Sequence, residues 1–364
     1  MSKARELANL GNVYDDGALS NRNMVVNGSM IVAQRGTSTS ITSAGSYFSP
    51  DRFEVGITAT DQLAATLSQS TVAPDGFANS LKFEVTTAET TLDADEIVTV
   101  RQKFEGQDLQ RIAKGTASAQ QVTASFWVRS SNTGTYILEL YDSDNTRQVS
   151  KSYTINSANT WEYKTITFPA DTTGAFNNDN NLSLFFMWWL AAGSNYTSGT
   201  LNTSWASATT ANRVVGQTNL IASTNDFYLT GVQLEVGDTA TPFEHRSYGD
   251  ELARCQRYFL MCKPDVASGI THAGFVNLNV RSTTARYGVI HFPVSMRVRP
   301  SLAYSGSLTA YSGSGSYAVS AISMNGSSFH TCEMEITAAS GATVGDGGWV
   351  RILAGAYVEF DAEL

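Results

Sequence analysis

The chain has 364 residues, of which 42% are hydrophobic and only 16% charged, with a formal net charge of −9. This length favours two folded units. The charged fraction is well below the ~25% of an average soluble domain, as in a β-rich protein or one whose surface is covered by neighbouring subunits. No run of Lys or Arg occurs, which argues against a nucleic-acid partner because binding phosphates needs a basic patch.

Residues 1–23 are predicted to form an N-terminal arm. Residues 3–10 have the pattern of a short helix with Leu7 and Leu10 on one side, and Gly11 can end it. So short a helix is not stable alone. Two interpretations stay open: a frayed terminus, or a peptide that attaches the protein to a neighbour.

Residues 24–246 carry short alternating segments separated by Gly, Asn, Asp and Ser turns, with hardly any helical period. This pattern predicts an antiparallel β-sandwich, and its number of strands favours a jelly roll. The clearest predicted strands are 122–129, 135–141, 161–168, 181–187 and 226–235.

Residues 247–259 interrupt the strand pattern and predict a linking helix, with Asp250 and Glu251 in its first turn and Arg254 and Arg257 later. Residues 260–364 predict a second, smaller β-sandwich domain. Its expected strands are 272–281, 287–292, 329–337 and 348–360. The Gly/Ser-rich stretch 305–316 is predicted to be a flexible, exposed loop.

Two sequence blocks carry a resemblance to a known family. Residues 229–246 (LTGVQLEVGDTATPFEHR), continuing into 249–259 (GDELARCQRYF), resemble a block of tail-fibre and receptor-binding proteins of tailed bacteriophages. Residues 22–36 and 49–53, near the start of the predicted jelly roll, also resemble these phage proteins. The resemblance implies a carbohydrate-binding-module-like jelly roll over 24–246, followed by a C-terminal module that trimerises.

Motifs for catalysis and for cofactors are missing. No nucleophile elbow, P-loop, dinucleotide fingerprint or H-E-x-x-H motif occurs, so the sequence predicts neither enzyme activity nor a cofactor. Cys255, Cys262 and Cys332 lack zinc-ligand spacing and are predicted to be reduced and mostly buried. The resemblance implies that a calcium ion can brace such a jelly roll, but Glu54 and Asp226 are only two of the six or more oxygen ligands that it needs. No metal-binding residues are therefore predicted, and a structural calcium stays open.

Targeting signals are absent as well. The N-terminus has no apolar core of a signal peptide. The longest apolar stretch, 184–192, is too short to cross a bilayer as a helix. We therefore expect no membrane insertion. Release by lysis, as for a virion component assembled in the host bacterial cytoplasm, would explain an external protein of this kind.

Adjacent tryptophans in 181–192 suggest a sugar-binding platform. On a strand, Trp188 and Trp189 must point to opposite faces. We expect an exposed Trp189 to form the platform with Tyr196 and Trp205, while Asn195 and Asn202 bind sugar hydroxyls. The alternative is that these aromatic residues pack in the core or at a subunit contact.

Two functions follow from these expectations. The first is a homotrimeric tail fibre in the virion that binds host surface polysaccharide and attaches to other tail or adaptor proteins through residues 1–23. The second is a purely structural virion protein, such as a tail, nozzle or capsid-decorating subunit, that binds no glycan.

Overall fold

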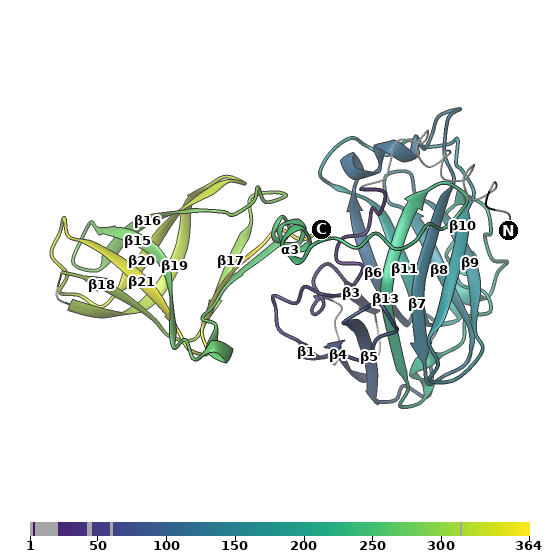
Figure 1. The fold of residues 1–364 in the computed structure, drawn as a ribbon, viewed down its shortest axis with the longest axis horizontal. Helices are drawn as coiled ribbons and strands as arrows, with labels where there is room; N and C mark the ends of the chain where they lie inside the picture. Colours follow the sequence, from purple (N-terminus) through teal and green to yellow (C-terminus); the bar gives the residue numbers. More distant parts are fainter. Residues whose placement is uncertain (1–2, 4–20, 42–45, 59–60, 314) are drawn as a thin grey trace. The chain divides into compact units, whose positions relative to one another are not determined.

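The computed structural model describes residues 3, 21–41, 46–58, 61–313 and 315–364 (Figure 1). Most of the arm, including the predicted helix 3–10 apart from Lys3, lies outside the described residues. The chain divides into two compact units, Met1–Glu251 with Leu364, and Leu252–Glu363. Strands dominate both units, which confirms the all-β fold class.

The first unit is a sandwich of two antiparallel sheets. The first sheet has the order β1 (Ser38–Ile41), β4 (Ala64–Ser70), β5 (Ser80–Thr87), β13 (Asp226–Val236), β7 (Val122–Ser130) and β10 (Glu162–Phe168). The second has the order β12 (Ala206–Ser207), β9 (Arg147–Ile155), β8 (Gly134–Asp142), β11 (Leu182–Ala192), β6 (Ile97–Glu105), β3 (Glu54–Thr58) and β2 (Ser46–Tyr47). The chain passes from one sheet to the other after β1, β3, β5, β6, β7, β9, β10 and β12, which is a jelly-roll pattern.

Side chains from the inner faces of both sheets form the core. Phe126 on β7, Phe186 and Trp188 on β11 are fully buried there. The Trp188 ring lies 4.3 Å from Phe186 and meets Phe126 edge-on at 5.6 Å. The alternation of apolar residues in the sequence therefore predicted the inward faces correctly.

A β-bulge in β13 connects this strand to the start of the described chain. Pairing of β13 with β7 shifts register between Thr230 and Gln233, where Gly231 adopts φ +61°. Because Val232 leaves the ladder, its N–H donates to Gly28 O at 2.9 Å. Its carbonyl accepts from Asn23 Nδ2 at 3.1 Å. Asn23 is thus part of the sandwich and not of the predicted arm.

Short helices connect the strands of the sandwich. They are η1 (Gly106–Ile112), α2 (Ser194–Thr197), η2 (Thr210–Asn212) and η3 (Leu220–Ala222). Helix α3 (Tyr248–Gln256) follows the sandwich, with Ser247 Oγ accepting from Asp250 N at its start. It ends three residues before the predicted end, because Phe259 already pairs in a strand. Among the described residues, no helix has the length and apolar content needed to cross a membrane.

The second unit contains a small sheet and a closed barrel. The sheet has the order β14 (Phe259–Cys262), β22 (Tyr357–Asp361) and β17 (Ser301–Ser305). The barrel runs β15 (His272–Val280), β16 (Ala285–His291), β20 (Thr331–Ala338), β19 (Gly315–Ser327), β18 (Leu308–Ser312) and β21 (Gly347–Leu353), and the short helix η4 (Val266–Ser268) precedes it. Its interior is filled by side chains such as Leu278, Met334, Ile336 and Val350.

Three expectations for this unit were wrong in detail. The predicted second sandwich is a barrel with a small sheet. The Gly/Ser-rich stretch 305–316 forms strand β18 between two turns, because Gly306 (φ +77°) and Gly313 (φ +54°) supply the backbone angles that those turns need. The segment 348–360 is two strands, separated by a turn at Gly355 (φ +80°).

All three cysteines are free, and Cys255 and Cys332 are buried as predicted.

Candidate ligand-binding surfaces

Trp188 and Trp189 point to opposite faces of the second sheet, as the strand pattern predicted. Trp188 belongs to the main core, whereas Trp189 joins a separate cluster with Ile137, Met187 and Val214 on the outer face. Both tryptophans have an exposed fraction of 0%. The expectation of an exposed Trp189 is therefore wrong.

The segment 193–219, here called the covering segment, buries Trp189. Val214 and Tyr196 of this segment pack against the outer face of the sheet, with the Tyr196 ring 5.6 Å from that of Trp189. Gln217 Nε2 donates to Trp189 O at 2.8 Å and Thr218 N to Thr135 O at 2.8 Å. The loop that was expected to extend a sugar platform instead covers the Trp189 side chain.

A buried ion pair lies beneath the covering segment. Glu139 on β8 accepts from Trp189 Nε1 at 2.8 Å and binds Arg213 through both carboxylate oxygens, at 2.8 and 2.9 Å. The Arg213 guanidinium lies 4.9 Å from the ring centre of Trp189. Burial opposes its charge, but the Glu139 carboxylate outweighs burial and raises the pKa of Arg213. These groups satisfy one another.

The other predicted platform residues do not meet around one open site. Trp205 is half-buried against the main core, donates to Pro169 O at 2.9 Å and lies 5.0 Å from Lys114 Nζ. Asn202 exchanges hydrogen bonds with Asn212 inside the covering segment. Asn195 is exposed and its N–H donates to Ala94 O. The structure brings Trp189 and Tyr196 together but not Trp205.

An exposed aromatic pair occurs instead on the outer face of the barrel. Tyr311 on β18 and Trp349 on β21 are direct cross-strand neighbours, and their rings lie parallel (10°) with centres 5.4 Å apart. Arg351 covers Tyr311 at 4.6 Å. Trp349 is 41% exposed, so part of its side chain is open to a ligand or partner.

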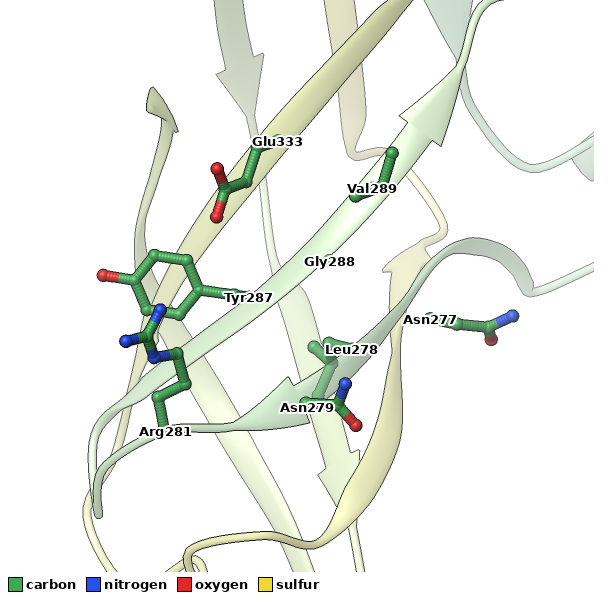
Figure 2. Close-up of a pocket in the computed structure, with 8 residues that line it drawn as sticks. All are labelled: Asn277, Leu278, Asn279, Arg281, Tyr287, Gly288, Val289 and Glu333. Atoms are coloured by element: carbon green, nitrogen blue, oxygen red, sulfur yellow. The ribbon is translucent and has the colours of Figure 1, made fainter. Parts of the chain in front are cut away.

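The barrel also has a hollow of about 430 Å³, whose lining residues are shown in Figure 2. Its lining residues include Leu278, Gly288 and Asn277, and Asn277 is the cross-strand neighbour of Trp349. A Cβ on Gly288 would lie 2.2 Å from Asn277 O, so the close approach of β15 requires glycine. The remaining lining residues are Asn279, Arg281, Tyr287, Val289 and Glu333.

Polar groups of different kinds surround this hollow. Figure 2 shows the Arg281 guanidinium against the Tyr287 ring, 4.9 Å from its centre, and Glu333 on the neighbouring strand. A hydrogen bond to Glu335 raises the pKa of the Tyr287 hydroxyl. Amide, guanidinium and carboxylate groups beside an apolar ring suit a polyhydroxylated ligand, which has both C–H faces and hydroxyls.

The tryptophan–tyrosine pair and the hollow, here called the barrel surface, were missed in the sequence. The segment 348–353 (GWVRIL) alternates, with Val350 and Ile352 buried and Trp349 and Arg351 outside. A tryptophan on the polar face of an alternating strand was the available signal. Nothing in the sequence indicated that Tyr311, from a supposed loop, would lie beside it.

No family model matches the chain, and no curated protein sequence matches it. Solved structures similar to it include the enzymatically active domain of tailspike protein 4 from bacteriophage CBA120, with 13% identity, a TM-score of 0.30, and coverage of 59% of this chain and 22% of that one. A xylan-binding domain from Paenibacillus barcinonensis has 9% identity and a TM-score of 0.28, covering 62% of this chain and 100% of that domain.

A family 11 carbohydrate-binding module from a cellulosomal cellulase of Clostridium thermocellum has 13% identity and a TM-score of 0.26, covering 57% of this chain and 100% of the module. The chain therefore spans about a fifth of the tailspike and the whole length of the two modules. Likenesses this low carry no argument about function, which must come from the sites on the fold.

Proposed function

We propose that the protein is a virion attachment protein of a tailed bacteriophage that binds a host surface polysaccharide through the barrel surface. The observation that carries the proposal is the exposed Trp349, held parallel to Tyr311 and next to a hollow with polar walls. The sequence blocks 22–36 and 229–246, with their resemblance to phage fibre proteins, support the virion context. The role is binding without catalysis.

The proposed contact combines stacking with hydrogen bonds. A sugar ring would lie on the exposed part of Trp349, and its hydroxyls would bind Asn277, Asn279 or Arg281. One aromatic contact contributes only about 1 kcal/mol, so a single site is weak. Three copies in a homotrimer, which we also propose, would strengthen attachment through effective concentration.

The test replaces Trp349 by alanine. We expect Trp349→Ala to abolish measurable binding to an array of bacterial surface polysaccharides and to reduce adsorption of phage at least tenfold, with an unchanged melting temperature. Phe329→Ala, at another exposed aromatic residue of the second unit, serves as the control and should retain binding. Unchanged adsorption of the Trp349→Ala phage would contradict the proposal.

One observation favours a purely structural role for the sandwich. Of the tryptophans expected to contact a glycan, Trp189 is fully buried and Trp205 is half-buried against the core, so the predicted platform is not formed. If neither Trp349→Ala nor Asn277→Ala alters binding or adsorption, the structural alternative holds for the whole protein. Hydrolysis of the bound polysaccharide would contradict a role without catalysis.

A further inference from the structure

Three carboxylates of the sandwich meet beside the loop between β5 and β6. Asp61 precedes β4, Glu89 follows β5 and Glu96 directly precedes β6. One oxygen from each lies within 4.8 Å of the other two. These residues are here called the acidic triad. Glu96 is only 1% exposed and Glu89 is 0% exposed.

Glu89 has an unsatisfied carboxylate oxygen inside this cluster. Its Oε2 accepts from Gln62 N at 2.8 Å, whereas Oε1 is buried and has no hydrogen-bond partner among the described residues. Glu96 Oε2 accepts from Asp93 N at 2.8 Å. A buried carboxylate oxygen without a donor is costly and rare in folded proteins, so it points to a missing group.

No basic side chain among the described residues balances the charge of these carboxylates. Within the part of the chain that the structure describes, no lysine or arginine forms an ion pair with Asp61, Glu89 or Glu96. Other carboxylates of the sandwich do have basic partners: Glu54 has Arg101, Glu139 has Arg213, Asp142 has Lys114, Asp171 has Arg147 and Asp226 has Lys82.

We propose that the acidic triad binds a divalent cation with oxygen ligands, for which calcium fits best. Two oxygens bound to one Ca²⁺ at about 2.4 Å can lie at most about 4.8 Å apart, and the triad meets this limit. Zinc favours nitrogen and sulfur ligands. Magnesium demands near-ideal octahedral geometry and keeps several waters, which suits a largely buried pair of glutamates less well. The exposed Asp61 side leaves room for water ligands.

A cation bound at this site would also hold the covering segment in place. The loop 88–96 between β5 and β6 forms backbone hydrogen bonds with the start of that segment and with Ile221, two residues beyond its end. Gly193 N donates to Glu96 O at 2.8 Å, Asn195 N to Ala94 O at 2.9 Å, and Glu89 N to Ile221 O at 2.9 Å. A Cβ on Gly193 would lie 1.9 Å from Asp93 O. A cation that fixes this loop therefore also fixes the cover over Trp189.

The experiment compares the full chain in CaCl2 and in EDTA. We expect calorimetric binding of one Ca²⁺ and a higher melting temperature of the sandwich in CaCl2. Glu89→Gln should weaken Ca²⁺ binding at least tenfold and lose this shift. In EDTA, Glu89→Gln should melt at or above the wild-type temperature, because the substitution removes repulsion among the carboxylates and supplies a donor. Glu89→Gln would thus lower the melting temperature relative to wild type in CaCl2 but not in EDTA. A residue with a purely structural role would lower it in both conditions.

A matched control is Asp75→Asn, at an exposed position outside the triad, which should keep full Ca²⁺ binding. Absence of binding and of any shift at millimolar CaCl2 would overturn the proposal, as would an equal shift in wild type and Glu89→Gln. A larger shift in MgCl2 than in CaCl2 would overturn the choice of calcium. None of these outcomes depends on glycan binding by the barrel surface.

Discussion

The carboxyl group of Glu162 in the sandwich has a strongly lowered pKa. It lies at the start of β10 with a side chain that is 14% exposed. Burial by itself raises its pKa, but Lys164, Ser157 N and the backbone and side chain of Asn156 all donate to it. These donors outweigh burial and lower the pKa of Glu162 from 4.5 to about 2.

This shift predicts a dependence of stability on pH. The folded pKa is below the unfolded one, so the stabilisation is complete above pH 4.5 and is lost as the pH falls towards about 2. Its upper limit is about 3 kcal/mol. Urea unfolding from about pH 5 to about pH 2 should show the wild type losing its advantage over Glu162→Gln. With Asp75→Asn as the control, a constant difference between wild type and Glu162→Gln would contradict this.

Single residues also mark where sequence reasoning stopped. The period of two in β11 indicated correctly that Trp188 and Trp189 face opposite ways. It could not indicate that Val214 and Tyr196, from a segment without regular pattern, cover Trp189. Burial by a loop is a tertiary effect, and no local feature of the strand encodes it.

At the scale of elements, strand β13 depends on a glycine in its bulge. Gly231 has φ +61°, and an added Cβ would lie 2.7 Å from Phe77 and 3.1 Å from Trp127. Phe77 itself packs against Phe243 and His245 at 5.1 and 5.3 Å. The block 229–246 therefore folds back over its own bulge, which explains why its glycine and aromatic residues occur together.

We expect Gly231→Ala to destabilise the sandwich by about 2–4 kcal/mol, because left-handed strain and a steric clash add. Gly216→Ala tests strain alone, since Gly216 has φ +87° and open space around it. That control should cost about 1–2 kcal/mol. The free energy of unfolding from denaturant titration measures both. Equal losses in the two variants would show that the Phe77 contact does not matter.

The positions of the strands were predicted better than the pairing between them. The expected strands 122–129, 135–141 and 226–235 agree with β7, β8 and β13 to within one residue at each end, because buried and exposed positions alternate in them. Strand β9 (RQVSKSYTI) was missed, since only Val149, Tyr153 and Ile155 are large apolar residues. The closure of the barrel depends on pairing between distant segments, such as β18 with β21, and no local pattern reveals it.

At the scale of the whole molecule, the proposed function requires the protein to assemble with copies of itself and with the virion. We propose that residues 1–20 attach the protein to the virion and that the chain forms a homotrimer. Arg22 and Asn23 contribute to the sandwich, where Asn23 N donates to Glu244 at 2.8 Å and Arg22 lies 3.8 Å from Glu235. A deletion should therefore stop before them.

Deleting residues 1–20 should leave melting temperature and oligomeric mass unchanged and abolish incorporation into particles. Light scattering gives the mass, and purified virions give the incorporation. The full-length protein is the control in both measurements. A monomer mass for the full chain would contradict the trimer, and normal incorporation of the shortened chain would contradict the attachment role.

The positions of the last strands also affect how the protein is made. In the sandwich, β13 lies between β5 and β7, and in the small sheet β22 lies between β14 and β17. Each of these strands is the last of its unit in the sequence, yet each occupies an interior place. A growing chain on the ribosome therefore exposes unpaired strand edges until each final strand emerges, and such edges invite aggregation. A polypeptide released before β13 emerges would therefore meet chaperones and proteases with the first sheet of its sandwich still incomplete.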